Sequence, residues 1–301
     1  DGNRYLAFDN KSVFESVNGQ AWSHIGQLGD NFTENFELVG TAYGNGKYVA
    51  VFAQPWSYSY TGTVEEKMAT MVSDNGSSWT VGHDNIQVVI SGGGYKNPSP
   101  GALTFGAGKF VAIDNQTVVG STDGVSWNSL GELPESAGIT DLEYGNGVFL
   151  ALESDPGYGN PGWWNYRPPK GRIFRSSDGA SWSKILDNIT YDNGSYGTAS
   201  ISPEEIVFGD GFFAAFDNKT ILTSSDGLNW NELGSISGSG AEGSLQWVET
   251  YDNGSTDNVT LEEIDHLLYG DGKYLALAKV KEIIPSTSYD TPYLSSGYSY
   301  Y

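Results

Sequence analysis

Hydrophobic and polar positions alternate along this chain in short runs that end at glycine-containing turns, and one such run recurs. The segment that begins at Tyr43 reads Y-G-N-G-K-Y-V-A-V, and similar copies begin at Phe105, Tyr144, Phe208 and Tyr269. A clipped copy, D-G-N-R-Y-L-A-F, opens the chain at Asp1. Asn-Gly and Asp-Gly suit the tight turn of a β-hairpin because both residues tolerate positive φ. Each copy therefore predicts strand, turn, strand, and the small alanines of the second strand suit burial on both faces.

A second motif, S-x-(D/N)-G-x-x-W, follows the hairpin in five of the six modules. Its tryptophans are Trp22, Trp79, Trp127, Trp182 and Trp230. The Asp or Asn side chain can accept hydrogen bonds from turn amides, the glycine takes the positive-φ position, and the tryptophan can cover the hydrophobic interface below. These residues are therefore predicted to stabilise the fold rather than to bind a ligand.

The five copies resemble the Asp-box, or bacterial neuraminidase repeat, of sialidase-like propellers, although they are one residue shorter than the commoner S-x-D-x-G-x-x-W form. The resemblance covers nearly the whole chain. It implies a β-propeller whose box turns lie away from the ligand face.

Two motifs supply four strands per module, and the modules begin near residues 1, 43, 105, 144, 208 and 269. We therefore expect an all-β chain that forms one domain over residues 1–301, a single β-propeller of about six four-stranded blades. Four insertions, 55–66, 155–170, 187–205 and 235–263, are predicted to be surface loops that carry any specificity.

The two ends of the chain are incomplete in complementary ways. The first module lacks the strand before its turn, and the sixth lacks the S-x-(D/N)-G-x-x-W motif and ends in the tail 292–301. Placed before Asp1, the terminal Tyr298–Tyr301 resembles the missing strand. The tail is expected either to close the ring within one molecule or to complete a blade of the next molecule by strand exchange, which would generate a fibre.

Composition narrows the possible partners. The 37 acidic and 15 basic side chains give a net charge of −22, which disfavours nucleic acid and anionic lipid surfaces. No apolar stretch is long enough for a membrane span. The chain has no cysteine, which excludes disulfides and Zn–thiolate sites. Its first residue, Asp1, is consistent with removal of a signal peptide or with a trimmed start.

Nine N-x-(S/T) tripeptides occur, more than the roughly four expected by chance, at Asn10, Asn31, Asn75, Asn115, Asn188, Asn193, Asn218, Asn253 and Asn258. Three of them, at Asn10, Asn115 and Asn218, occupy one repeated hairpin, where Asp-Asn also favours a turn. The copies in unrelated insertions favour N-glycosylation, which predicts an exported, cell-surface glycoprotein.

The sequence predicts no catalytic site and no cofactor. His24, His83 and His266 have no partners at metal-ligand spacing, so no transition-metal site is predicted. The Asp-Asn and Asp-Gly clusters could bind calcium, but this is a minor alternative since the sequence has no D-x-D-x-D-G loop. The sialidase resemblance would require an arginine triad. The chain offers only Arg4, Arg167, Arg172 and Arg175, and it has no F-R-I-P motif.

An aromatic insertion is the best candidate for ligand contact. It contains Trp163, Trp164 and Tyr166, whose rings could stack on sugars, pack within their own loop or form a subunit interface. We interpret the sequence as a non-catalytic extracellular propeller that serves as a structural or adhesive subunit and self-associates into a fibril. The alternative is a carbohydrate-binding or carbohydrate-active propeller.

Overall fold

The structure is a computed structural model of the chain. It describes residues 4–9, 11–19, 21–28, 36–53, 63–91, 102–114, 116–135, 138–155, 170–187, 189–192, 198–201, 203, 205–217, 220–235, 246–250, 256–270 and 273–283. No helix in this described part is long and apolar enough to cross a membrane.

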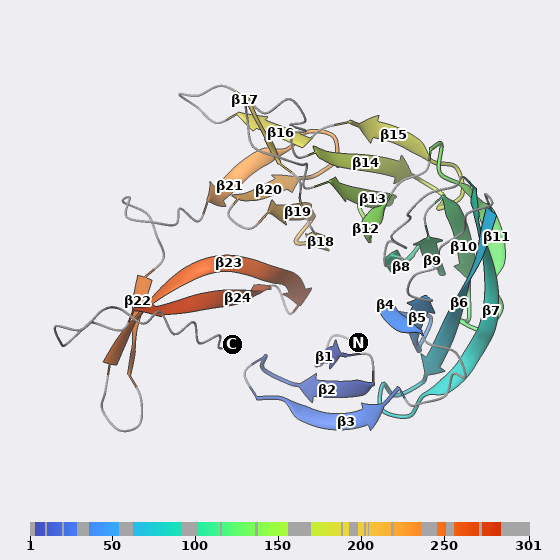
Figure 1. Cartoon of the computed structure of the whole chain (residues 1–301), viewed down its shortest axis with the longest axis horizontal. Helices are drawn as coiled ribbons and strands as arrows, with labels where there is room; N and C mark the ends of the chain where they lie inside the picture. The colour runs from blue at the N-terminus through green and yellow to red at the C-terminus, as the bar shows by residue number, and fades with distance from the viewer. Residues whose placement is uncertain are drawn as a thin grey trace.

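The fold is an all-β propeller whose antiparallel blades follow one another around an axis (Figure 1). The first blade has three strands, β1 (Tyr5–Phe8), β2 (Ser12–Ser16) and β3 (Ser23–Gln27). The second has β4 (Glu37–Gly44), β5 (Lys47–Ala53), β6 (Thr63–Ser73) and β7 (Thr80–Ser91). The third has β8 (Ala102–Gly106), β9 (Lys109–Asp114), β10 (Thr117–Ser121) and β11 (Asn128–Glu132). The fourth has β12 (Ile139–Gly145), β13 (Val148–Asp155), β14 (Lys170–Ser176) and β15 (Ser183–Leu186). The fifth has β18 (Glu205–Gly209), β19 (Phe212–Asp217), β20 (Thr220–Ser224) and β21 (Asn231–Ser235).

Two smaller sheets accompany the blades. A hairpin of β16 (Ile189–Asp192) and β17 (Thr198–Ile201) lies between the fourth and fifth blades in the chain. The last sheet contains β22 (Gln246–Thr250), β23 (Thr256–Gly270) and β24 (Lys273–Ile283), with β23 in the middle.

The prediction of six four-stranded blades is wrong. The described residues form five blades of three to four strands. The first blade has three described strands, with none inside β1, and the sixth module does not form a blade. The sixth module has no S-x-(D/N)-G-x-x-W turn that could join a third strand to a fourth. Its residues extend the hairpin instead, so that β23 and β24 pair over the length of β24.

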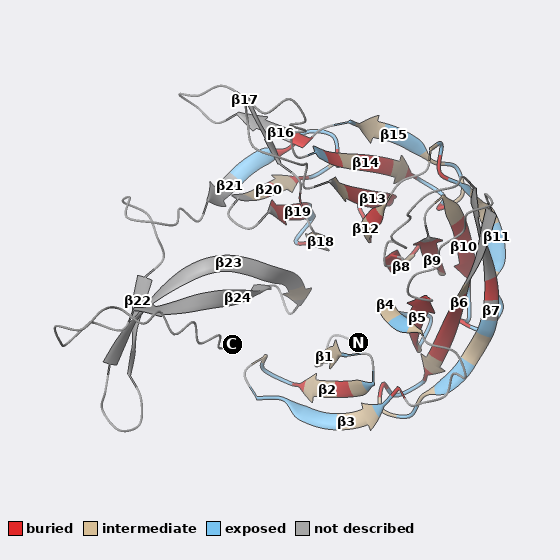
Figure 2. Ribbon diagram, in the orientation of Figure 1, coloured by how far each residue is buried: buried red, intermediate tan, exposed pale blue. Residues whose placement is uncertain are grey.

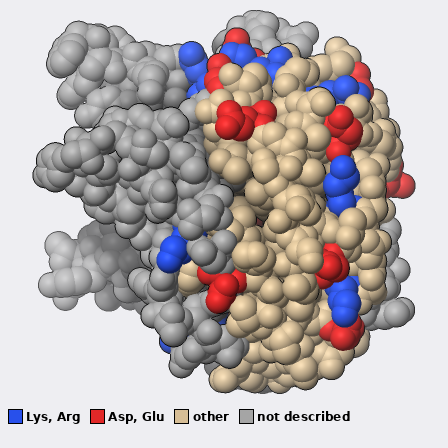
Figure 3. Space-filling view, turned by 90° about the vertical axis from the view of Figure 1, so that its right-hand side faces the viewer, with Lys and Arg blue, Asp and Glu red and all other residues tan. Residues whose placement is uncertain are grey.

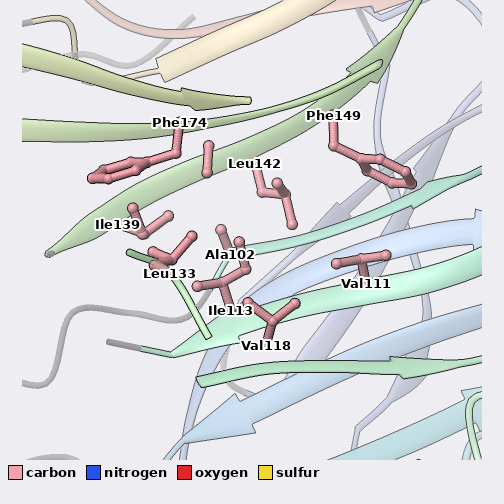
Figure 4. Close-up of a cluster of buried hydrophobic side chains, with 10 residues drawn as sticks. Ala102, Val111, Ile113, Val118, Leu133, Ile139, Leu142, Phe149 and Phe174 are labelled. Atoms are coloured by element: carbon pink, nitrogen blue, oxygen red, sulfur yellow. The ribbon is translucent and has the colours of Figure 1, made fainter. Parts of the chain in front are cut away.

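The hydrophobic core lies between the blades. Residues of the second strand of each four-stranded blade are buried on both faces, as in β5, where all residues from Tyr48 to Ala53 are buried (Figure 2). Side chains from two neighbouring blades form each cluster. Figure 4 shows the cluster between the third and fourth blades, in which Val111 and Ile113 face Leu142 and Phe149. Small residues of the same cluster, such as Ala102 and Ala151, leave room for these large neighbours.

The hairpin turns have the conformation that their sequences predict. Asn45, Ala107, Asn146 and Asp210 have φ of 48–50°, and each is followed by a glycine with φ of 76–82°. Two successive positive φ values define a type I′ turn, whose twist matches that of the flanking strands. We call the end of the blades that carries these turns the turn face and the opposite end the loop face.

The same contact between an aromatic ring and a glycine joins the inner strands of neighbouring modules. A Cβ atom built on Gly44, Gly106, Gly145 or Gly209 would lie 2.1 Å from the aromatic ring of Phe105, Tyr144, Phe208 or Tyr269, respectively. In each case the ring belongs to the next module. Only a glycine leaves this space, which explains why the recurring motif pairs an aromatic residue with a following glycine. The contact of Tyr269 with Gly209 also places β23 beside β18.

Candidate functional site

The S-x-(D/N)-G-x-x-W turns lie on the turn face and have one hydrogen-bond pattern in all five copies. In the turn of the fourth blade, the Ser176 hydroxyl accepts the amide N–H of Gly179 at 2.9 Å, and Asp178 Oδ1 accepts the amides of Ala180 and Ser181 at 2.8 and 2.7 Å. Trp182 Nε1 donates to the Gly179 carbonyl at 3.2 Å. The amide donors hold the pKa of the Asp178 carboxyl well below its usual range.

Each tryptophan from the second to the fifth copy packs at the boundary with the preceding blade. Trp79, Trp127 and Trp182 cover three interblade clusters, and Trp230 is buried in the fourth. Trp22, in the first blade, is more exposed. The four packed side chains are therefore engaged in the fold, and their indole N–H groups donate within their own turns.

Polar side chains also connect the blades along the turn face. Asn45 Nδ2 donates to the carbonyls of Gly108 and Thr122 in the third blade, at 3.0 and 3.1 Å. Asn146 Nδ2 makes the same two contacts with Gly211 and Ser225 of the fifth blade, both at 2.9 Å. These hydrogen bonds are therefore structural contacts between neighbouring blades on the turn face.

The insertions emerge at the loop face. Because strands alternate in direction, the connection from the second strand to the third and the connection to the next blade both start at the end opposite the type I′ turns. The insertions 55–66 and 155–170 belong to the first kind of connection, and 187–205 and 235–263 follow the outer strands of their blades. The described strand ends that flank these four segments therefore lie at one end of the propeller. The expectation that all four are loops is only partly met, because β16 and β17 lie within 187–205 and β22 lies within 235–263.

An ion-pair network lies at the loop end of the fourth blade. Arg172, on β14, donates to Glu153 Oε1 on β13 at 2.5 Å and to Glu135 Oε1 at 3.1 Å. Lys184 Nζ, on β15, contacts Glu135 Oε1 at 3.0 Å and Asp187 Oδ1 at 2.6 Å. The hydrogen bond from Lys184 and the charge of Arg172 lower the pKa of the Glu135 carboxyl. The network links β13 and β14, the two strands that carry the aromatic insertion between them.

Two carboxyl groups lie on the inner strand of the same blade. Asp141 Oδ2 accepts the amide N–H of Ile206 on β18 at 2.8 Å, and its Oδ1 accepts that of Leu142 at 2.8 Å. The carboxyl of Glu143 is hydrogen-bonded to the backbone of Phe208, two residues farther along β18. The pair therefore bridges the backbone edges of two neighbouring blades.

Burial controls the charge of this pair. It raises the pKa of the Asp141 carboxyl to about 7, and the nearby charge of Glu205 acts in the same direction. It also raises the pKa of Glu143 well above its usual value, and the charge of Asp141 adds to that effect. Both oxygens of Asp141 already accept backbone amides, so this group is suited to joining strands rather than to donating a proton to a substrate.

The three arginines that the structure describes do not form the triad that a sialidase would need. Arg4 lies at the turn face of the first blade, where it contacts Glu15 Oε1 at 2.8 Å and the Asn75 carbonyl at 2.5 Å. Arg172 lies at the loop end of the fourth blade, and Arg175 is three residues along the same strand. Arg167 lies outside the described residues.

Other predicted sites are only partly described. Trp163, Trp164 and Tyr166 lie outside the described residues, as do seven of the nine sequon asparagines, Asn10, Asn31, Asn115, Asn188, Asn193, Asn218 and Asn253. Asn258 lies on β23, opposite Val248 and Ile283. Asn75 is exposed on the turn face, where its Oδ1 accepts the amides of Ser77 and Ser78, both at 2.9 Å.

The charged groups form no concentrated patch on the side of the molecule shown in Figure 3. There, acidic and basic side chains are interspersed among other residues over the described surface. Within the described residues, no group of three or more His, Asp or Glu side chains is arranged to hold a metal ion.

The sequence interpretation missed both the carboxyl pair and the ion-pair network. One signal for the pair was present. Asp141 and Glu143 occupy positions of the repeat where the second module has Gly40 and Ala42. Acidic residues at such inner-strand positions could have been recognised by aligning the modules.

Several solved structures are similar to this chain in shape. The GH93 α-L-arabinofuranosidase of Fusarium graminearum has a TM-score of 0.49 and 16% identity, over 90% of this chain and 84% of that chain. The Neurospora crassa Pan2 WD40 domain has a TM-score of 0.44 and 10% identity, over 86% and 69%. The Trypanosoma rangeli sialidase has a TM-score of 0.41 and 13% identity, over 92% and 57%.

These matches assign no activity to this chain, because their identities and TM-scores are low and their names describe different proteins. No family model matches the chain, and no curated protein matches it. The strand topology characterises the molecule as a β-propeller.

Proposed function

We propose that this protein is an extracellular, Asp-box-like propeller that binds carbohydrate at its loop face without cleaving it. The observation that carries the proposal is that the described strands flanking four insertions have their ends at one end of the blades, opposite the turn face. Loops held by a rigid scaffold are the usual place for ligand contacts.

The aromatic insertion indicates the chemical class of the ligand. Trp163, Trp164 and Tyr166 provide aromatic planes that suit the apolar faces of sugar rings. The strands on either side of this insertion pair from Phe149–Ser176 to Asp155–Lys170, and the contact of Arg172 with Glu153 ties them together. A rigid base of this kind reduces the entropy lost when a loop orders around a ligand.

A non-catalytic role is favoured by how the described carboxyl groups are used. Asp141 accepts two backbone amides, and Glu153 and Glu135 both contact Arg172. A glycosidase needs one carboxyl group that can donate a proton and a second that faces the sugar. The charged groups at this end of the fourth blade instead stabilise the scaffold.

The test is binding of soluble oligosaccharides and polysaccharides to the full chain, measured by glycan array and calorimetry. Replacement of Trp163 or Trp164 by Ala should weaken binding at least tenfold. The matched control is Phe212→Ala, which removes an aromatic side chain that is 48% exposed on the turn face and should leave affinity unchanged. Absence of binding, or an equal loss in the control, would overturn the proposal. Release of reducing sugar would overturn its non-catalytic part.

A structural role in a cell-surface assembly is the second candidate. It is favoured by the first blade, in which the structure describes three strands, with β1 innermost among them, where four strands are typical. Sedimentation of the full chain tests it, because a protein that is monomeric at all concentrations has no such role by self-association.

A further inference from the structure

The seam between the fourth and fifth blades differs from the two seams before it at two positions of the inner strand. The second and third modules have small residues at these positions, namely Gly40, Ala42, Ala102 and Thr104. A Cβ atom on Gly40 would already lie 3.1 Å from Leu103 Cβ, so β4 and β8 approach each other with no side chain between them. The fourth module has Asp141 and Glu143 instead, and their carboxyl groups bridge from β12 to the backbone of β18.

The turn end of this seam is held by contacts that do not titrate. Asn146 Nδ2 donates to the carbonyls of Gly211 and Ser225, both at 2.9 Å. Gly227, in the S-x-(D/N)-G-x-x-W turn of the fifth blade, lies against Leu150, because a Cβ atom on that glycine would be 2.6 Å from Leu150 Cδ1. An amide side chain and an apolar contact do not change charge with pH. This end of the seam therefore stays joined when the pH changes.

Toward the loop end, the same seam is held by groups that do titrate. β12 begins at the loop end, so Asp141 lies nearer to the loop face than Glu143. Asp141 Oδ2 accepts the amide of Ile206 at 2.8 Å, and Glu143 is hydrogen-bonded to the backbone of Phe208. Both residues belong to β18, whose alternate amides point away from its partner β19. The joint at this end therefore depends on the protonation of two carboxyl groups.

The charged groups that act on this pair within the described part of the chain are acidic. Glu205, at the loop end of β18, acts on Asp141 across the seam, and Asp141 acts on Glu143. The strands packed against β12 on its other sides, β8, β9 and β13, carry the charged residues Lys109, Asp114, Glu153 and Asp155. Of these, Lys109 donates to the Asp178 carbonyl and Glu153 contacts Arg172.

The sign of the pH effect follows from these surroundings. Burial, together with the neighbouring acidic groups, raises the pKa of Asp141 to about 7 and that of Glu143 well above its usual value. The pair is therefore neutral in acid and becomes charged as the pH rises through about 7 and beyond. Ionisation then places like charges from β12 and β18 on the two sides of a seam from which water is excluded.

A loop-face segment is packed into the same seam. Ile189, the first residue of the hairpin β16–β17, is fully buried in the cluster that contains Ile206 of β18 and Leu152 of β13. β16 also contacts β14 of the fourth blade and β21 of the fifth. A movement of β18 away from β12 at the loop end would therefore displace this hairpin.

We propose that the fourth and fifth blades form a pH-dependent hinge, which is closed at the loop end in acid and opens there above neutral pH while the turn end stays joined. Opening exposes the amides of Ile206 and Phe208 to water and moves the hairpin β16–β17 at the loop face. The movement requires no ligand, so its test is independent of the proposed carbohydrate binding.

The test is amide hydrogen exchange of the full chain, resolved by residue, at pH 5 and pH 8.5. Each rate is divided by the rate of an unstructured amide at the same pH, which gives a protection factor. Val207 is the internal control, because its amide points toward β19 rather than toward β12. The protection of Ile206 and Phe208, relative to that of Val207, should fall at least tenfold between the two pH values. Equal changes at all three amides would show a loss of stability of the whole blade and would overturn the hinge.

A variant tests whether the carboxyl pair operates the hinge. With Asp141→Asn and Glu143→Gln together, the relative protection should stay the same at both pH values, because no group in the pair can ionise. The matched control is Asp84→Asn, at an exposed position on β7, which should keep the fall seen in the wild type. A fall of wild-type size in the double variant would overturn the proposal. If the double variant does not fold, the wild-type measurement still decides, since an unchanged ratio there overturns the proposal by itself.

Discussion

The buried carboxyl group of Asp141 should make the stability of the propeller depend on pH. Its pKa lies at about 7 in the folded chain and at 3.8 without the fold. Between these values the folded protein binds more protons than the unfolded chain, so the free energy of unfolding falls as pH rises. One pKa unit corresponds to about 1.4 kcal/mol, and roughly two units are crossed between pH 5 and pH 7. We therefore expect the wild type to lose on the order of 3 kcal/mol between pH 5 and pH 8 through this group.

The perturbation is Asp141→Asn, which keeps one amide-accepting oxygen and removes the titration. Its absolute stability at pH 5 should fall, because one of the two backbone amides, that of Leu142 or Ile206, loses its acceptor. Relative to the wild type, however, the variant should gain about 3 kcal/mol on going from pH 5 to pH 8.

Urea unfolding at the two pH values, followed by tryptophan fluorescence, measures this difference. The matched control is Asp84→Asn, at an exposed position on β7, which should follow the pH dependence of the wild type. The charge of Asp141 contributes to the raised pKa of Glu143, so the same comparison is made in a Glu143→Gln background, where this second titration is absent. If Asp141→Asn shows the same loss between pH 5 and pH 8 as the wild type, the reasoning from burial is refuted.

Three further changes test other parts of the structure. Ser176→Ala removes the buried hydroxyl that accepts two turn amides and should lower the free energy of unfolding by about 1–3 kcal/mol, whereas the exposed Ser183→Ala should change it by less than about 0.5 kcal/mol in the same urea assay. Gly106→Ala places a Cβ atom 2.1 Å from the facing ring of the next blade and should lower the thermal midpoint more than Gly108→Ala, which has no atom within 4 Å and is affected by its positive φ alone; equal effects would contradict the interblade fit. Asn75→Asp should remove one glycan from native material while preserving the turn, because Oδ1 is the atom that accepts the amides; an unchanged intact mass would show that this site carries no sugar.

The blade-number error shows where reasoning from a repeat fails. The hairpin motif occurs in six modules, but the turn that joins the third strand to the fourth occurs in five. Counting modules therefore overestimated the blades. Within the described residues of the sixth module, β23 and β24 pair as an extended hairpin, and its sequence has no S-x-(D/N)-G-x-x-W turn to bring the chain back for an outer pair.

The sequence by itself determined the local structure of this protein. Type I′ turns at Asn45-Gly46 and the S-x-(D/N)-G-x-x-W turns depend on residues that are neighbours along the chain, so their φ preferences and short hydrogen bonds are readable from the sequence. Burial of the second strands was also predicted from the sequence, because these strands consist of aromatic, β-branched and small residues.

Only the tertiary structure decided which distant residues meet. Gly44 accommodates the ring of Phe105, and Asp141 accepts the amide of Ile206, across blade boundaries that depend on the spacing and rotation of whole sheets. The raised pKa of Asp141 exists because packing removes that group from water, which no local pattern reports.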